Sequence, residues 1–159
     1  MKMRVGIGYD VHRLEDNRKL ILGGVEIQSE KGLLGHSDAD VLTHAIMDAL
    51  LGAAGLGDIG VHFPDNDPSY KDASSLFMLS KVKKILTEIG WSIENIDATI
   101  IAQAPKLSMF YAEMAQNIAD TLETNKSTVN IKATTEEGLG FTGTKQGIAT
   151  HAVALIVQK

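Results

Sequence analysis

The sequence predicts an α+β protein built as one domain. Short apolar strand patterns alternate with three longer stretches whose apolar residues recur at helical spacing. The expected helices are 38–52, 74–90 and 106–122, and the expected strands are 4–9, 20–27, 97–102, 129–134 and 148–158. No internal repeat, low-complexity tract or linker interrupts the 159 residues, so we expect a single domain over residues 1–159.

Alternation predicts the first strand. Val5, Ile7 and Tyr9 project to the same side, which is typical of a strand with one buried face. The polar residues 14–19 are expected to form a loop. Residues 20–27 are expected to form a strand pair that breaks at two adjacent glycines.

The helix expected at 38–52 begins in a stretch rich in chemically active side chains. Ser37 and Asp40 have the spacing of a capping box, and a glycine-rich segment ends the helix. Asp40, His44 and Asp48 recur every four residues and are therefore expected to share one helix face. A parallel apolar stripe would be buried, formed by Leu42, Ile46 and Leu50.

The remaining elements follow from apolar spacing and from proline. Residues 57–72 have no regular period and contain two prolines, so we expect an irregular loop there. The apolar face of the helix at 74–90 consists of Leu76, Leu79, Val82, Leu86 and Ile89. The apolar stripe of the helix at 106–122 consists of Phe110, Met114, Ile118 and Leu122.

Charge and composition argue against several classes of protein. Twenty acidic and fifteen basic side chains give a net charge of −5, and no basic stripe with interleaved aromatic residues is present, so we expect no nucleic-acid partner. No apolar run is long enough to cross a membrane, and the N-terminus has no signal-peptide pattern, so we expect no membrane partner and a cytoplasmic protein. The chain has no cysteine, so a metal site would depend on imidazole and oxygen ligands.

Two histidines and an aspartate are the candidates for such a site. Asp10 and His12 project to the same side of the first strand, because side chains alternate along a strand. His44 lies near the start of a helix that would hold it rigidly. One carboxylate and two imidazoles suit a divalent ion, most naturally zinc (Zn²⁺), with a position left open for substrate. The simpler alternative is that the three are unrelated surface or core residues.

Further motifs occur along the whole chain in a fixed order. They are Asp10-Val11-His12, His36-Ser37-Asp38-Ala39-Asp40-Val41-Leu42-Thr43-His44, Gly57-Asp58-Ile59-Gly60, Phe63-Pro64-Asp65, Ala102-Gln103-Ala104-Pro105-Lys106, Lys132-Ala133-Thr134-Thr135 and Gly138-Leu139-Gly140-Phe141-Thr142-Gly143. Together they resemble the 2-C-methyl-D-erythritol 2,4-cyclodiphosphate synthases, a family of the non-mevalonate route to isoprenoid precursors. The resemblance implies a phosphorus–oxygen lyase that closes 4-diphosphocytidyl-2-C-methyl-D-erythritol 2-phosphate into a cyclic diphosphate and releases CMP.

The resemblance also implies two metal ions and two catalytic residues. Zinc or another divalent metal would be held by Asp10, His12 and His44, and Glu137 would hold Mg²⁺ or Mn²⁺ on the substrate diphosphate. His36 and Thr135 match the positions that stabilise the transition state. The alternative for His36 is a loop histidine that only orients the next turn.

Substrate contacts follow from the resemblance in the same way. The ribose contacts are Asp58 and Gly60, with Ile59 between them as a further substrate contact, although an aspartate cap and a turn glycine are common in any loop. The methylerythritol contacts are Phe63, Pro64, Asp65, Asn66 and Asp67. The cytosine pocket is formed by Ala102, Gln103, Ala104, Pro105, Lys106, Leu107 and Ser108. Further contacts are Asp10, His12, His36, Ser37, Thr134, Thr135, Glu136, Glu137, Phe141 and Thr144, whereas His62 and His151 match no functional position.

Two positions depart from the family pattern. Glu136 stands where the family commonly has a threonine, which makes the choice of the second metal ligand depend on the offset of Glu137 from Phe141. Thr144 stands where a basic residue is often found, with Lys145 beside it. The implied fold is a mixed sheet with helices on one face, assembled as a homotrimer through packed sheets. The implied active site would be shared between neighbouring subunits.

Two other functions use the same residues. A hydrolase could use water on the metal, although no further general base is evident beside His36 and the aspartates. A non-catalytic protein could bind a nucleotide or an isoprenoid diphosphate in a trimer. Release of CMP without incorporation of water distinguishes the synthase from both.

Overall fold

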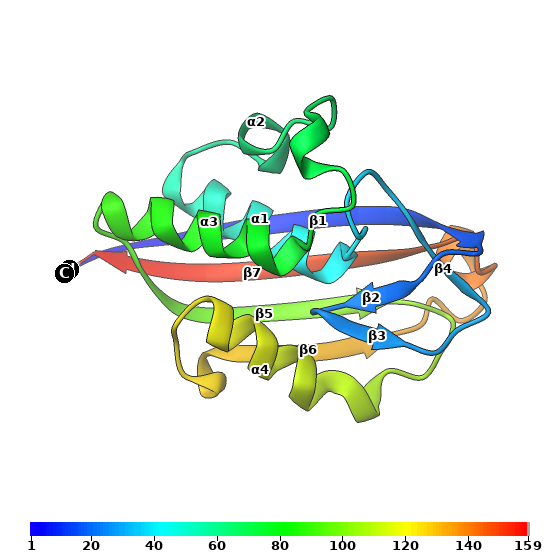
Figure 1. The fold of residues 1–159 in the computed structure, drawn as a ribbon. Helices are drawn as coiled ribbons and strands as arrows, with labels where there is room; N and C mark the ends of the chain where they lie inside the picture. Colours follow the sequence, from blue (N-terminus) through cyan, green and yellow to red (C-terminus); the bar gives the residue numbers. More distant parts are fainter. Residues whose placement is uncertain (159) are drawn as a thin grey trace.

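A five-stranded mixed sheet forms the centre of the computed structural model, which describes residues 1–158 (Figure 1). The strand order is β4-β1-β7-β5-β6, with antiparallel neighbours except for the parallel pair β5–β6. The sheet strands are β1 (Lys2–Asp16), β4 (Lys31–Leu34), β5 (Ser92–Ile101), β6 (Val129–Thr134) and β7 (Gly147–Gln158). A separate hairpin pairs β2 (Leu20–Leu22) with β3 (Val25–Ile27).

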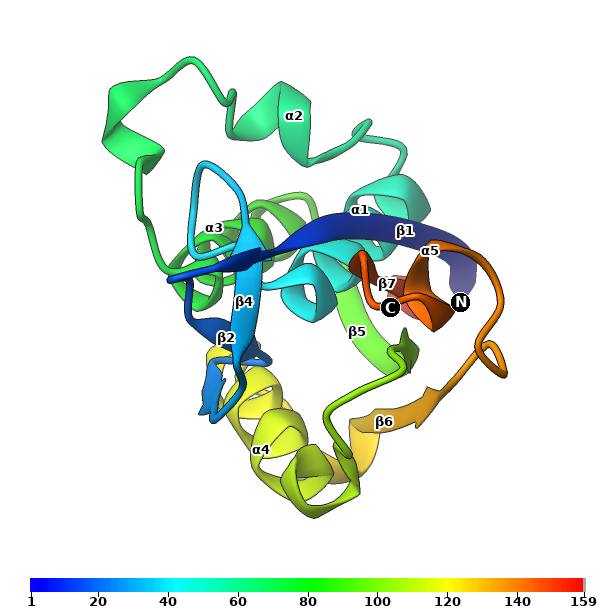
Figure 2. The same cartoon turned by 90° about the vertical axis from the view of Figure 1, so that its right-hand side faces the viewer.

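Helices cover one face of this sheet, as Figures 1 and 2 show from two directions. The α-helices are α1 (Val41–Ala54), α2 (Ile59–His62), α3 (Ser75–Glu88), α4 (Tyr111–Thr121) and α5 (Gly140–Gly143). Short 3₁₀ turns are η1 (Pro68–Tyr70), η2 (Ser108–Phe110) and η3 (Lys126–Thr128). The expected α+β class with a mixed sheet and helices on one face is therefore confirmed. In the part of the chain that the structure describes, no helix is both long and apolar enough to cross a membrane.

Several element boundaries differ from those expected. The loop expected at 14–19 is wrong for its first half, because β1 continues to Asp16 by pairing with β4, which the pattern missed. The loop at 57–72 contains α2 and η1. The helix expected at 106–122 begins as η2 and becomes α4 only at Tyr111. The strand pair at 20–27 is confirmed as β2 and β3.

Close packing of α1 on β1 decides which face of the first strand is covered. A side chain at Gly8 would place its Cβ 1.9 Å from the carbonyl oxygen of Ala45, and one at Gly6 would lie 2.0 Å from that of Ala49. Only glycine allows the helix and strand backbones to approach this closely. Because side chains alternate, Asp10 lies on the same helix-covered face, two residues beyond Gly8.

The apolar side of β1 consequently faces away from the helices. Val5, Ile7 and Tyr9 are 68%, 71% and 47% exposed, so the expectation that they form a buried face is wrong for the isolated chain. Met3 and Val11 extend the same row, which makes a continuous exposed apolar strip on the bare face of the sheet. Such a strip is typical of a surface that another protein chain covers.

The start of α1 also differs from the expectation. Asp40 is the N-cap, and its buried carboxylate accepts from the amides of Thr43, Gly23 and Gly24 at 3.0, 3.0 and 2.9 Å. The capping box between Ser37 and Asp40 is therefore wrong, and so is the expectation that Asp40 shares a face with His44, because its carboxylate is used to hold the β2–β3 turn. Burial and the charge of Asp38 raise the pKa of Asp40.

The apolar stripes expected for the helices are largely confirmed. Leu42, Ile46 and Leu50 of α1 are fully buried. The core of α3 is formed by Leu79, Val82 and Leu86 and that of α4 by Met114, Ile118 and Leu122, whereas Ile89 lies exposed at the C-cap of α3.

Candidate metal centre and substrate cavities

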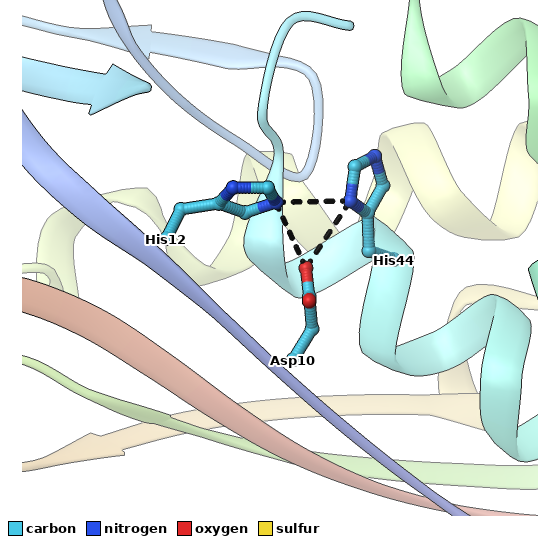
Figure 3. Close-up of side chains that lie close together, drawn as sticks. All are labelled: Asp10, His12 and His44. Carbon is cyan, nitrogen blue, oxygen red and sulfur yellow. Dashed lines mark hydrogen bonds and ion pairs between the residues drawn. The ribbon is translucent and has the colours of Figure 1, made fainter. Parts of the chain in front are cut away.

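Three side chains from β1 and α1 converge on one point (Figure 3). Asp10 Oδ2 lies 3.0 Å from His12 Nε2 and 3.1 Å from His44 Nδ1. The two ring nitrogens lie 3.2 Å apart. The group expected from the sequence is therefore assembled, since the glycine-mediated contact of β1 with α1 brings His44 over Asp10 and His12.

The outer nitrogen of each ring is already occupied by a partner. His12 Nδ1 donates to the backbone carbonyl of Leu34 at 2.9 Å, which requires a proton on Nδ1 and leaves a lone pair on Nε2. His44 Nε2 lies 2.8 Å from Ser75 Oγ, and His44 Nδ1 faces the other two ligands. Both rings thus turn an unprotonated nitrogen toward the carboxylate of Asp10 in these tautomers.

The group fits a divalent ion. Two lone pairs and a carboxylate aimed at one point repel one another unless a proton or a metal cation lies between them. In a tetrahedral zinc site with bonds of about 2.0–2.1 Å the ligand atoms are about 3.3 Å apart, close to the separations in this group. The donor set of two imidazoles and one carboxylate leaves a fourth position for a substrate oxygen.

Without a metal ion between them, Asp10 and His12 favour each other's charged forms. Burial raises the pKa of Asp10, but hydrogen bonds and charges of His12 and His44 outweigh it and bring the pKa to about 2. Burial lowers the pKa of His12, but the hydrogen bond and charge of Asp10 outweigh it, so the pKa lies above its ordinary value. Asp10 is therefore an anion at neutral pH and available as a ligand.

A cavity of about 230 Å³ opens beside the three residues. Of the residues expected in the site, it is also lined by His36, Ser37, Ile59, Gly60, Phe63 and Asp65. Sequence reasoning missed Gly35, Tyr70 and Met78, which also line it. Nothing in their local pattern distinguishes Tyr70 or Met78 from ordinary packing residues, because only the tertiary placement of η1, which carries Tyr70, and of α3, which carries Met78, brings them to the cavity.

The loop between α1 and α3 is held by polar side chains, some its own and others from outside it. Asp48 accepts from the amide of Ile59 at 2.8 Å and fixes α2 against α1. Asp58 caps α2 and Asp67 caps η1, which are the common loop roles for aspartate. The carbonyl of Asp67 accepts from His36 Nε2 at 3.2 Å, so His36 is tied to the far side of this loop. Pro64 and Asn66 lie in the same loop but do not line the cavity.

A second cavity, of about 330 Å³, lies at the carboxyl ends of the parallel strands β5 and β6. Its lining contains most residues of the expected cytosine pocket, namely Ala102, Gln103, Pro105, Lys106, Leu107 and Ser108, together with two of the further expected contacts, Thr134 and Thr135. Ala133 and Tyr111 also line it, and the sequence did not single out Tyr111. Ala104 lies in the same segment, joined to Pro105 by a cis peptide bond.

The segment after β6 approaches this second cavity through one contact. Gly138 donates its amide to Gln103 Oε1 at 3.2 Å. Glu136 and Glu137 are both exposed, but Glu136 accepts a hydrogen bond from the buried hydroxyl of Thr142, whereas Glu137 has a positive φ of 55°. The two adjacent glutamates therefore differ in their hydrogen bonding and in their backbone conformation.

Phe141 and Thr144 do not line either cavity. The hydroxyl of Thr144 donates to the carbonyl of Gly140 at 2.8 Å, and Phe141 is partly exposed on α5. Among the described residues, His62 makes no hydrogen bond to a residue that lines either cavity. Its Nε2 lies 2.9 Å from the carbonyl oxygen of Leu56. His151 packs against Tyr9 on the bare sheet face, with ring centroids 4.8 Å apart.

The two cavities lie at separate places in one chain. They share no lining residue. The strand order puts β7 and β5 between β1 and β6, which separates these two strands by about 14 Å at the usual spacing.

Comparisons with known proteins agree on one family. The YgbB family model matches residues 3–157. A 2-C-methyl-D-erythritol 2,4-cyclodiphosphate synthase of Clostridium novyi (strain NT) is 62% identical over 157 residues, which cover 99% of this chain and 100% of the relative.

Solved structures with a similar fold indicate the same family. The bifunctional IspDF of Campylobacter jejuni superposes with a TM-score of 0.96 at 45% identity over 99% of this chain, which corresponds to 43% of that longer chain. The IspF of Plasmodium falciparum in complex with CDP superposes with a TM-score of 0.86 at 35% identity, over 99% of this chain and 97% of the other. This chain therefore belongs to the YgbB family, together with the 2-C-methyl-D-erythritol 2,4-cyclodiphosphate synthases that are its relatives.

Proposed function

We propose which residues of this chain perform each part of the reaction that its relatives are named for. In that reaction 4-diphosphocytidyl-2-C-methyl-D-erythritol 2-phosphate closes to 2-C-methyl-D-erythritol 2,4-cyclodiphosphate, and CMP leaves. The 2-phosphate must attack the β-phosphorus of a diphosphate, so two anions approach each other. Phosphoryl transfer of this kind depends on in-line positioning and on neutralisation of charge.

The observation that carries the proposal is the convergence of Asp10, His12 and His44 at the wall of the 230 Å³ cavity. The chain has a net charge of −5, so its overall field does not attract an anionic substrate. We assign the three residues to a divalent ion, zinc by the nature of the donors. When bound, this ion supplies positive charge to phosphate oxygens.

His36 is assigned to a phosphate oxygen of the same substrate. Its Nε2 already donates to the carbonyl of Asp67, which leaves Nδ1 as the ring nitrogen that is assigned to the phosphate oxygen. Asp65, in the same cavity wall, is assigned to a hydroxyl of the methylerythritol. Asp58, the N-cap of α2, and Gly60, within α2, are assigned to the ribose.

The second cavity is assigned to the cytosine base and the adjoining phosphates. The structure of the Plasmodium relative contains CDP, which supports a nucleotide in this family. The backbone of residues 102–108 is available to pair with the edge of a base, and Lys106 supplies a positive charge. Thr135, at the end of β6 in the same cavity, is assigned to the oxygens that gain charge in the transition state.

Each complete active site is proposed to lie between two subunits of a homotrimer. The separation of the two cavities within one chain supports this assembly, because one substrate must contact both. The exposed row of Met3, Val5, Ile7, Tyr9 and Val11 supplies an apolar surface for the contact. A closed ring of three identical contacts generates three such sites.

The synthase is distinguished from a hydrolase by the fate of water. The cytidylyl-linked substrate is incubated with the protein in water enriched in oxygen-18, and the products are analysed by mass spectrometry. We expect equimolar CMP and cyclic diphosphate, neither of which carries the heavy isotope. Heavy oxygen in CMP or in a linear phosphate would identify a hydrolase, and unchanged substrate would identify a binding protein.

Glu137 is proposed to hold the Mg²⁺ or Mn²⁺ ion on the diphosphate. Both glutamates are exposed, but the carboxylate of Glu136 already accepts from Thr142, which favours Glu137 as the ligand. We expect Glu137→Gln to raise the Mg²⁺ concentration needed for half-maximal activity at least about tenfold, because a charged oxygen ligand is lost. Zinc content, measured by elemental analysis, should not change.

Glu136 provides the matched comparison for this prediction. Glu136→Thr restores the residue common in the family, and we expect its Mg²⁺ dependence to stay close to that of the unaltered protein. A larger change in Mg²⁺ dependence for Glu136→Gln than for Glu137→Gln would contradict the assignment.

A further inference from the structure

A hydrogen-bonded series of side chains, made of buried Ser75 and half-buried Asp38, lies behind the metal ligand His44. Its Nε2 is 2.8 Å from Ser75 Oγ, and the hydroxyl of Ser75 in turn contacts the carboxylate of Asp38. We propose that Ser75 and Asp38 are positioning residues, which fix His44 in the one tautomer that can bind a metal ion. This inference rests on the metal site proposed above.

The direction of each hydrogen bond follows from the chemistry of the groups. A carboxylate only accepts, so the single hydroxyl proton of Ser75 is donated to Asp38 Oδ1. The lone pairs of Ser75 Oγ are then directed to His44, whose Nε2 must be the donor. A neutral imidazole carries one proton, so Nδ1 of His44 is left with a lone pair toward Asp10 and His12.

The carboxylate of Asp38 is itself held in place. Its Oδ2 accepts from the amide of Ser75 at 3.0 Å and its Oδ1 from the amide of Asp40 at 3.2 Å. The amide of Asp38 donates to the carbonyl of Ala73 at 3.1 Å. These bonds join the segment before α1 to the first residue of α3, so the position of the ligand depends on both helices.

Burial strengthens the hydrogen bond between Ser75 and His44. Ser75 is fully buried and His44 is 6% exposed, so water does not compete for the bond between them. Ser37 Oγ also approaches His44 Nε2, but at 3.2 Å, and it already accepts from the amide of Ala39. Ser75 is therefore the main acceptor, and Ser37 is a weaker substitute when Ser75 is lost.

His12 is oriented by a hydrogen bond to the backbone rather than to a side chain. Its outer nitrogen donates to the backbone carbonyl of Leu34, which no side-chain substitution removes. Only the orientation of His44 depends on two side chains that can be altered while all three metal ligands remain. This difference makes the proposal testable.

We expect Ser75→Ala to weaken zinc binding by about 10- to 100-fold, the usual effect of removing a partner behind a histidine ligand. Asp38→Asn should have a smaller effect in the same direction, because an amide oxygen still accepts from Ser75 but carries no full charge. Ser75→Thr retains the hydroxyl and should restore most of the affinity. Zinc-loaded protein is mixed with excess chelator, and both the equilibrium zinc content and the rate of release are measured.

Ser74→Ala is the matched control, because Ser74 is the N-cap of the same helix and accepts from the amide of Phe77. It disturbs the start of α3 without contacting His44. Thermal unfolding of all variants is measured in parallel. The proposal requires Ser75→Ala to lose zinc faster than Ser74→Ala at a comparable loss of stability.

The possible results test the positioning role of Ser75 separately from the existence of the metal site. Equal zinc affinity in Ser75→Ala and Ser74→Ala would overturn the positioning role while leaving the site intact. If Ser75→Ala does not fold, the same comparison is made between Asp38→Asn and Ser74→Ala. Absence of stoichiometric zinc from the unaltered protein after zinc loading would instead overturn the proposed metal site.

Discussion

Replacement of His44 by alanine is expected to remove the bound divalent ion and to reduce turnover by at least about a thousandfold. The loss of one of three protein ligands leaves Asp10 and His12, which are too few to hold zinc tightly. A metal that neutralises phosphate charge contributes several kcal/mol to the transition state, and about 4 kcal/mol corresponds to a thousandfold in rate. His12→Ala should have the same effect, because it removes a ligand of the same kind.

Elemental analysis of the purified protein measures the zinc content, and circular dichroism shows whether the fold is retained. His62→Ala serves as the control, since His62 bonds only to the carbonyl of Leu56 among the residues described and lies outside the metal group. We expect the control to keep its zinc and its activity. Stoichiometric zinc in folded His44→Ala protein would show that the ion is held elsewhere.

Two inactive variants are expected to restore activity to each other when they are assembled together. His12→Ala removes the metal half of the site, and Thr135→Ala alters the nucleotide half. In a ring of three head-to-tail contacts, every mixed trimer contains one site in which both halves are unaltered. Random assembly of equal amounts makes about three quarters of the trimers mixed, so about one quarter of the sites should be active.

The two variants are unfolded, mixed, refolded and assayed, and native mass spectrometry verifies that mixed trimers have formed. Mixing His12→Ala with His44→Ala is the matched control, because both changes lie in the metal half and no combination restores a complete site. Mixed trimers of His12→Ala and Thr135→Ala that show no recovery would place both halves of the site in one chain.

The residues of the metal group could be identified from the sequence because each signal is local. Asp10 and His12 share a strand face by alternation alone, and His44 belongs to a helix whose apolar stripe was correctly predicted. The ordered motifs along the chain also indicated the family, which the comparison over residues 3–157 confirmed.

Other features depended on contacts between segments far apart in the chain. Alternation shows that β1 has two different faces but not which one is covered, and the exposed face is the apolar one because Gly6 and Gly8 let α1 pack on the other. Spacing predicts that Asp40 shares a helix face with His44, but its carboxylate binds the β2–β3 turn instead.

Ser75 gives the clearest limit of reasoning from sequence. Nothing distinguishes it locally from Ser74, and both stand at the start of the same helix. Only the packing of α3 against α1 brings the hydroxyl of Ser75 to His44, 31 residues earlier in the chain. The sequence determined which side chains could bind a metal, whereas the tertiary structure decided how they are held, because a hydrogen bond needs two distant segments at a fixed separation.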